Sequence, residues 1–334
     1  MRILITGSLG LVGSEASRFY LERGHRVIGI DNNMRKQFFG EEGCGLKNMI
    51  KHENYTHIRA DITRPKISTY IYQYKPDVLI HAAGQPSHDW SAKNPMLDFD
   101  VNACGTLLLL ESLRINCPDS VFVFLSTNKV YGDRPNNLPF IETDTRYELD
   151  PTIMDADSIA ENFPIDNSTH SPFGASKLAA DIMVQEYGRY FGMKTGVFRC
   201  GCITGSQHAG VELHGFLSYM AKCKKENRRY TVYGYKGKQV RDIIYSGDLV
   251  TAIDSFISNP RVAEVYNMGG GKHSNISILE ALKVFGITDW DYVDEPRKGD
   301  HQWYISDVTK FKTHYPEWEY QYNMEKIIEE LTKT

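Results

Sequence analysis

The first two-thirds of the chain alternate short apolar runs with amphipathic stretches. This alternation is typical of βαβ units, whose strands form a parallel sheet. The pattern predicts helices over residues 14–23, 96–116 and 172–191. It predicts strands near residues 2–6, 25–30, 56–60, 77–81, 121–125 and 194–199. We therefore expect an α/β fold with a Rossmann-type, doubly wound parallel sheet.

Two long connections interrupt this rhythm, one after Asp31 and one over residues 132–170. Loops of this length in a compact domain are usually lids or binding segments. After Arg199 the alternation becomes irregular, with short strands between helical stretches near residues 212–226, 247–258 and 277–285. We therefore predict a nucleotide-binding domain over residues 1–200. Residues 201–334 would form a smaller, mixed substrate-binding lobe that is not independent of the first domain.

Composition and charge exclude several classes of function. The chain has 38 basic and 42 acidic residues, hence a net charge of −4, and its pI is near 6.3. This balance gives no general attraction to nucleic acid or to an anionic membrane. No stretch approaches the roughly 18 apolar residues of a spanning helix, and a strand from Arg2 leaves no room for a signal peptide. We expect a cytoplasmic protein.

The cysteines do not indicate a disulfide framework or a metal site. Their scattered positions and the lack of an export signal favour reduced thiols at residues 44, 104, 117, 200, 202 and 223. The pair Cys200-x-Cys202 has the wrong spacing for a zinc knuckle. We therefore expect no metal.

The first predicted strand runs into the turn Thr6-Gly7-x-x-Gly10-x-x-Gly13. Glycines at this spacing allow a tight turn, close approach of a pyrophosphate, and phosphate binding at a helix N-terminus. The second strand ends about 20 residues later in Asp31, where a carboxylate can accept both ribose hydroxyls and repels a 2′-phosphate. NAD is thus favoured, although Arg35 and Lys36 leave NADP open. We include the adjoining residues Leu11, Val12 and Asn32 in this cofactor site.

Further motifs, in the same order along the chain, resemble a known family. They are Asp61-Ile62, His81-Ala82-Ala83-Gly84, Asn102, Ser126-Thr127 and Lys177. With the glycine turn, they resemble the extended short-chain dehydrogenase/reductase family, in the branch that handles nucleotide sugars. Within that branch the chain is most similar to the CDP-paratose/CDP-tyvelose 2-epimerases. The segments that carry this similarity are residues 83–85, 126–133 and 237–242, and the pair Asn128-Lys129 contributes much of it.

The resemblance implies a tightly held NAD that takes a hydride from a sugar carbinol and returns it to the other face of a keto-sugar. It implies that Thr127 hydrogen-bonds the reacting oxygen and that Lys177 binds the nicotinamide ribose. It places the cofactor on Asp61, Ile62, Ala82, Ala83, Gly84, Asn102 and Lys177. It places the substrate on Gln85, Ser87, Asn128, Lys129, Arg241 and Arg297, where the two arginines hold the diphosphate.

One residue of the family pattern is missing. The family's base is the tyrosine of a Tyr-x-x-x-Lys motif, but this chain has Phe173 four residues before Lys177. Loss of a general base typically costs about 10² to 10⁴ in rate. Three explanations are open. The phenylalanine is an engineered change, or another group acts as the base, or the protein binds nucleotide and sugar without turnover. If Phe173 is natural, our candidate for the base is His88, which titrates near neutrality; Cys202 and His170 rank below it.

The sequence thus predicts an NAD-dependent nucleotide-sugar epimerase, with C2 of a CDP-hexose as the leading reaction. A UDP-, GDP- or dTDP-sugar 4-epimerase or dehydratase is the alternative. The dehydratase is disfavoured because Asn128-Lys129 stands where that class places an Asp-Glu pair. A non-catalytic protein that binds NAD and nucleotide sugar is the third possibility. The helices over residues 96–116 and 172–191 resemble the pair through which the family forms dimers, so we expect a homodimer.

Overall fold

The centre of the molecule is a parallel sheet of seven strands, seen in a computed structural model that describes all residues except 155, 209, 213–214, 298 and 334. The order is β12-β8-β5-β4-β1-β2-β3, and every neighbouring pair is parallel. The strands are β1 (Arg2–Thr6), β2 (Arg26–Asp31), β3 (Tyr55–Arg59), β4 (Val78–His81), β5 (Val121–Thr127), β8 (Lys194–Cys200) and β12 (Glu264–Met268). The expected Rossmann-type α/β fold and its six strands are confirmed. β12 was not predicted, because it lies in the irregular part of the sequence.

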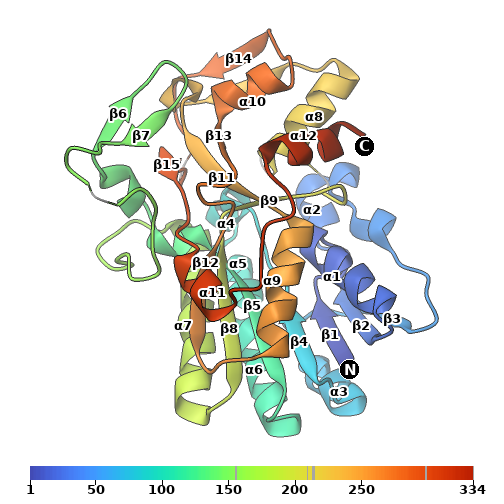
Figure 1. The fold of residues 1–334 in the computed structure, drawn as a ribbon. Coiled ribbons are helices and arrows are strands. Elements are labelled where there is room, and N and C mark those ends of the chain that lie inside the picture. The colour runs from blue at the N-terminus through green and yellow to red at the C-terminus, as the bar shows by residue number, and fades with distance from the viewer. Residues whose placement is uncertain (155, 209, 213–214, 298, 334) are drawn as a thin grey trace.

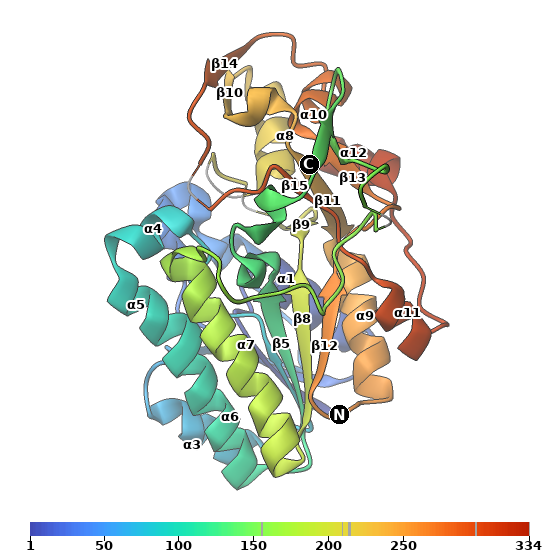
Figure 2. The same cartoon turned by 90° about the vertical axis from the view of Figure 1, so that its left-hand side faces the viewer.

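Helices cover both faces of this sheet (Figure 2). One face carries α3 (Lys66–Tyr74), α6 (Gly105–Asn116) and α7 (Ser171–Phe191), packed through side chains such as Ile71, Leu109 and Val184. The other carries α1 (Leu11–Glu22), α9 (Ser246–Ser258) and α11 (Thr309–His314), packed through Ala16, Ile253 and Phe311. The helix predicted over residues 96–116 is divided into α5 (Pro95–Phe99), a π-helical turn (Asp100–Cys104) and α6. The sheet is therefore the middle of three layers.

A smaller lobe lies beyond the carboxyl ends of the strands, at the top of Figure 1. Its helices are α8 (Phe216–Glu226), α10 (Ile278–Val284) and α12 (Met324–Lys333). Its strands are β6 (Phe140–Glu142), β7 (Tyr147–Leu149), β9 (Cys202–Thr204), β10 (Tyr230–Tyr233), β11 (Val240–Tyr245), β13 (Asn275–Ser277), β14 (Trp290–Val293) and β15 (Trp303–Tyr304). Of the helix predicted near residues 212–226, positions 213 and 214 lie outside the described residues.

Short helices complete the connections. α2 (Arg35–Phe39) and two 3₁₀ turns (Glu41–Gly43 and Gly45–Asn48) follow β2, and α4 (His88–Lys93) follows β4. Three further 3₁₀ turns, η4 (Asn128–Tyr131), η5 (Arg134–Asn137) and η6 (Tyr235–Gly237), lie after β5 and after β10. The two long connections expected after Asp31 and Gly132 thus contain local structure of their own.

A boundary at residue 200 does not describe the two parts of the molecule. β12, α9 and α11 come from the second half of the chain but complete the sheet layer and its core. Conversely, Tyr131 and Leu149 from the first half pack with Trp303 and Tyr304 of the smaller lobe. The chain crosses between the parts several times, because each part completes its core with segments from the other half.

The described residues contain no helix that is both long and apolar enough to cross a membrane. In the same part of the chain, no three His, Cys, Asp or Glu side chains are grouped so that they could hold a metal ion. All six cysteines are free, and Cys200 and Cys223 are buried.

Candidate active site

A cavity of about 440 Å³ joins the carboxyl ends of the central strands to the smaller lobe. Its wall includes the glycine turn and Lys177 on the sheet side, and Arg241 and Arg297 on the lobe side. A second cavity of about 90 Å³ shares Gly7 and Gly10 with the first. Both lie where the strand order reverses between β1 and β4, the place at which open α/β sheets bind ligands.

The glycine turn between β1 and α1 depends on the absence of side chains. Gly7 has φ +72°, and a Cβ there would lie 2.6 Å from the backbone nitrogen of Ala83. A Cβ on Gly13 would overlap the carbonyl oxygen of Gly7. α1 begins after Gly10 with no side-chain cap and no acidic residue in its first turn, and its first residues Leu11 and Val12 line the cavity. The free N–H groups of this helix end form an anion site.

Asp31 fixes the loop at the end of β2. Its carboxylate accepts hydrogen bonds from the backbone N–H of Leu9 (3.0 Å) and of Asn33 (2.6 Å). In the smaller cavity Asp31 is joined by Asn32, Asp61 and Ile62, and the side chain of Asn32 donates to Asp61 (3.2 Å). The structure thus brings these four cofactor candidates together beside the glycine turn.

The loop after β4 separates candidates that face the cavity from those that support its wall. Ala82, Ala83 and Gly84 line both cavities. Asn102, 1% exposed, lies behind the loop, where its Oδ1 accepts from the backbone N–H of Gln85 at 2.8 Å. The sequence predicted that Asn102 contacts the cofactor directly. In the structure the Asn102 amide instead holds the backbone of the loop after β4.

Gln85 and Ser87 also point into the wall. The Gln85 side chain donates to Asp98 (2.7 Å) and to the carbonyl oxygen of Ser87 (2.9 Å), although the residue itself borders the cavity. The Ser87 hydroxyl accepts from the backbone N–H of Trp90 (3.3 Å) and caps α4. These contacts place both side chains, predicted to bind substrate, in structural roles.

Thr127 and Lys177 lie together at the end of β5. The Thr127 hydroxyl donates to Asn128 Oδ1 (3.4 Å) and accepts from the backbone N–H of Lys129 (3.2 Å). Lys177 Nζ donates to the carbonyl oxygen of Leu125 (2.6 Å) and lies 4.1 Å from the centre of the Phe124 ring. Burial lowers the pKa of Lys177 to about 8. Thr127, Asn128 and Lys177 all line the main cavity.

Phe173 fills the position of the missing base, in the first turn of α7. Its ring lies against that of His88, with 4.7 Å between the ring centres. His88 Nδ1 contacts the Ser171 hydroxyl at 3.2 Å. Burial, with further contributions from Lys129 and Arg297, lowers the pKa of His88 to about 3. Both rings line the cavity, and His88 is neutral at physiological pH.

The lobe side of the cavity contains a cluster of charged side chains. Arg241 on β11 donates to Asp300 at 2.5 Å, and Arg297 lies 3.6 Å from Asp89. Burial opposes ionisation of Asp300, but Arg241, Lys129 and Arg297 outweigh it and lower its pKa to about 2. The positive charges, partly balanced by the carboxylates of Asp300 and Asp89, suit an anionic ligand.

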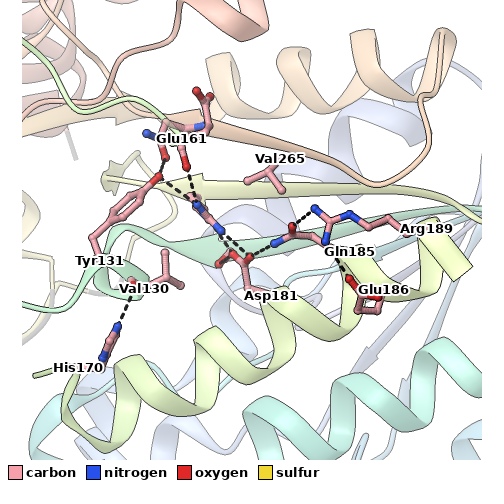
Figure 3. A network of polar contacts seen from close by, with 12 residues as sticks. Val130, Tyr131, Glu161, His170, Asp181, Gln185, Glu186, Arg189 and Val265 are labelled. Atoms are coloured by element: carbon pink, nitrogen blue, oxygen red, sulfur yellow. Dashed lines mark hydrogen bonds and ion pairs between the residues drawn. The ribbon is translucent and has the colours of Figure 1, made fainter. Parts of the chain in front are cut away.

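A buried network behind the site was missed by the sequence reasoning. Arg199 on β8 donates to both carboxylate oxygens of Asp181 on α7, at 2.9 and 3.0 Å, and to the Tyr131 hydroxyl at 3.2 Å. Tyr131 donates to Asn267 on β12 at 2.7 Å. Figure 3 shows Tyr131, Glu161 and Asp181 converging from three segments. The only sequence signal is that Asp181 stands one helical turn after Lys177.

Comparison with known proteins identifies the family. Residues 3–269 match the NAD dependent epimerase/dehydratase family. The chain belongs to this family. It is 32% identical to the CDP-paratose 2-epimerase of Salmonella typhi over 323 residues, which cover 93% of this chain and 92% of that one. It is 28% identical to dTDP-glucose 4,6-dehydratase 1 of Escherichia coli K12 over 306 residues, covering 88% and 77% of the two chains.

Solved structures show the same fold. The UDP-glucose 4-epimerase of Thermus thermophilus, in complex with NAD, has a TM-score of 0.78 at 24% identity, covering 100% of this chain and 98% of that one. The UDP-glucose 4-epimerase of Thermotoga maritima, with UDP-glucose, has a TM-score of 0.80 at 23% identity and the same coverage. The expected membership of the extended short-chain dehydrogenase/reductase family is confirmed, and so is the Rossmann-type fold.

The cofactor of the family is NAD, as expected from the sequence. The residues present fit it, because the uncapped end of α1 suits a pyrophosphate and Asp31 stands beside the adjoining small cavity. When bound, NAD supplies the acceptor and donor of a hydride. Thr127 and Lys177 line the main cavity, which continues to the charged cluster of the lobe.

Proposed function

We propose that this protein is an NAD-dependent nucleotide-sugar epimerase that inverts C2 of a CDP-hexose through a transient keto-sugar. The observation that carries the proposal is the single cavity shared by the glycine turn, Thr127 and Lys177, and the arginines of the lobe. The similarity to a CDP-paratose 2-epimerase along nearly the whole chain supports the choice of CDP and C2.

In this function Asp31 accepts the hydroxyls of the adenosine ribose, and the N-terminus of α1 holds the pyrophosphate. Thr127 hydrogen-bonds the reacting sugar oxygen. Lys177, already directed across β5 by its bond to Leu125, contacts the nicotinamide ribose. Arg241 and Arg297 hold the substrate diphosphate, for which planar guanidinium groups are well suited.

The test is to mix NAD-loaded protein with CDP-, UDP-, GDP- and dTDP-hexoses. We expect a transient NADH absorbance and a C2-inverted product with a CDP-sugar. Inversion at C4 or loss of water from another nucleotide sugar would contradict the proposal. A thermal-shift titration with CDP, UDP, GDP and dTDP gives an independent ranking of the nucleotide bases.

A second candidate, a protein that binds NAD and nucleotide sugar without turnover, is favoured by Phe173, which has no hydroxyl at the family's base position. In that case the wild-type protein binds both ligands but produces no NADH. The variant Phe173→Tyr would then gain turnover, because a tyrosine beside Lys177 restores the missing acid–base group. Turnover by the wild-type protein excludes this candidate.

The protein that carries out this function would be a homodimer formed through α5, α6 and α7. These helices stand on the outer side of the sheet layer, on the left in Figure 2. They expose several large apolar side chains, namely Met96, Phe99, Leu107, Ile115, Ile182, Tyr190 and Phe191. Such a concentration of exposed apolar groups is typical of an interface.

Light scattering should give twice the mass of the chain. Ile182→Glu, at a side chain 40% exposed on α7, should give a monomer. The matched control Val262→Glu, at a side chain 50% exposed outside these helices, should stay dimeric. A monomeric wild-type protein would contradict the expected dimer.

A further inference from the structure

The cavity wall next to Phe173 contains a second amine besides Lys177. Lys129 belongs to η4, directly after Thr127, and lines the main cavity. The geometry points to Lys129 as the group that accepts the sugar hydroxyl proton in place of the tyrosine that Phe173 replaces. This assignment rests on the proposed function and adds a catalytic residue to it.

The backbone places Lys129 next to the empty base position. Its N–H donates to the Thr127 hydroxyl at 3.2 Å, so η4 is fixed to the residue expected to contact the reacting oxygen. Its carbonyl oxygen packs against the first turn of α7, where a Cβ on Gly174 would lie 2.8 Å from it. Gly174 follows Phe173 directly. The backbone of Lys129 is therefore hydrogen-bonded to Thr127 and packed against Gly174, the residue after Phe173.

The Lys129 amine is available as a base. Within the described residues, its Nζ has no carboxylate within 4.0 Å and no hydrogen-bond acceptor, in contrast to Lys177. Burial, with smaller contributions from Arg241 and Arg297, lowers the pKa of Lys129 to about 8, while Asp300 and Cys202 oppose the change. A base is most effective when its pKa lies near the working pH, and with a pKa of about 8 roughly a tenth of the amine is in the active, neutral form at pH 7.

The other groups around Phe173 are less suited to this task. His88, with a pKa of about 3, is too weak a base, and it is confined between the Phe173 ring, Ser171 and Gly299. Burial raises the pKa of the Cys202 thiol to about 11, so it is protonated at physiological pH. Lys177 is held by the carbonyl oxygen of Leu125. Lys129 is the group here that combines suitable basicity with an uncommitted nitrogen.

The step balances as follows. The carbinol O–H bond breaks and its proton passes to the neutral amine of Lys129, which becomes an ammonium. The C–H bond breaks with its electron pair, and the hydride reduces the nicotinamide of NAD⁺ while the carbon–oxygen double bond forms. After the keto-sugar turns over, the hydride returns to the opposite face and the Lys129 ammonium gives the same proton back.

The variants Lys129→Arg and Lys129→Met distinguish a Lys129 that accepts a proton from a Lys129 that only attracts the substrate diphosphate by its charge. Arginine keeps the positive charge but cannot be deprotonated. We expect both variants to lose about 10² to 10⁴ in kcat while binding NAD as the wild type does. The exposed-lysine control Lys51→Arg should leave kcat unchanged. If Lys129→Arg keeps kcat within about tenfold of wild type, Lys129 only binds anions and the assignment is wrong.

The pH dependence gives a further test. The neutral amine is the active form, so kcat/KM should rise with pH and reach a plateau above about 8. Phe173→Tyr combined with Lys129→Arg should recover turnover, because the tyrosine then supplies the acid–base group. If His88→Ala abolishes turnover while Lys129→Arg does not, the base is His88.

A measurement without turnover tests the same assignment. Lysines methylated with ¹³C-formaldehyde are titrated by NMR, and the Lys129 signal is the one missing from Lys129→Arg. We expect its midpoint near 8, against about 10.4 for surface lysines. A midpoint near the surface value overturns the assignment of Lys129 and leaves the proposed function intact. Absence of turnover in the wild type overturns the proposed function itself, whatever the midpoint.

Discussion

The two ends of the cavity are built in different ways. The cofactor end consists of short, self-contained segments, residues 6–13, 31–33 and 61–62, which contribute backbone groups and a few carboxylates. The substrate end consists of long side chains from distant segments, with Lys129 beside Arg241, Arg297 and Asp300. The first type of site is visible as a spacing in the sequence, whereas the second exists only when the segments meet.

The difference extends to electrostatics. At the cofactor end the helix terminus attracts an anion through N–H groups that carry no formal charge. At the substrate end the formal charges are buried: burial lowers the pKa of Lys129 to about 8, and the neighbouring cations lower that of Asp300 to about 2. The cofactor end therefore depends on shape, and the substrate end on a balance of charges.

The largest expected effect concerns the network that joins the two regions. Arg199→Met leaves Asp181, which is 0% exposed, without its cation. Breaking a buried pair in this way typically costs about 3–5 kcal/mol. We expect that loss in the free energy of unfolding measured with urea, in one transition, because Arg199 connects β8, α7 and Tyr131.

The matched control is the double variant Arg199→Met/Asp181→Leu, which removes both charges and should regain most of the loss. If the single variant loses less than about 1 kcal/mol, the pair of Arg199 and Asp181 does not join the regions. Two separate transitions would show that the two ends unfold independently.

Gly13→Ala should affect the cofactor end alone. The added methyl group overlaps the carbonyl oxygen of Gly7, which belongs to the turn and cannot move without deforming it. Overpacking of this kind costs about 1–3 kcal/mol. We expect weaker NAD binding by about tenfold or more in calorimetry, since about 1.4 kcal/mol corresponds to tenfold.

Binding of CDP, at the other end, should change little in Gly13→Ala. The control Gly247→Ala, at the start of α9, meets no atom closer than 3.4 Å and should leave both affinities unchanged. Equal losses of affinity for NAD and for CDP would mean that the cofactor end and the substrate end do not bind their ligands independently.

A further expected effect is an acid dependence shared by both ends. Burial lowers the pKa of His81, on β4, and of His301, in the lobe, well below 6.5. Below pH 6.5 the unfolded chain binds protons at these residues and the folded chain does not. Stability should therefore fall as the pH drops, by about 1.4 kcal/mol per pH unit for each histidine.

Urea unfolding between about pH 7 and pH 5 measures this slope. His81→Asn and His301→Asn should each reduce this slope by the contribution of one proton. An unaltered slope in His301→Asn would show that the lobe histidine is protonated in the folded protein.

Much of the cofactor end could be predicted from the sequence, and less of the substrate end. The strands, the glycine turn and Asp31 follow from local spacing, and the resemblance to the family added Asp61, which lies with Asp31 in the small cavity. Asn102 and Gln85 were assigned to ligands but support the loop after β4, because a buried amide bonds to whichever backbone group is nearest. The seventh strand, β12, was missed because it lies in the irregular part of the sequence, where helices and short strands do not alternate regularly.

The sequence by itself determined the fold class and the cofactor, because βαβ periodicity and glycine spacing are local properties of the chain. The family followed from the resemblance of its motifs, in their order along the chain, to those of a known family. It also showed that Phe173 has no hydroxyl where the family has its base. Only the tertiary structure decided which groups face that position. Burial makes His88 a weak base and brings the pKa of Lys129 near 8, and such shifts arise from neighbours that meet only in the folded chain.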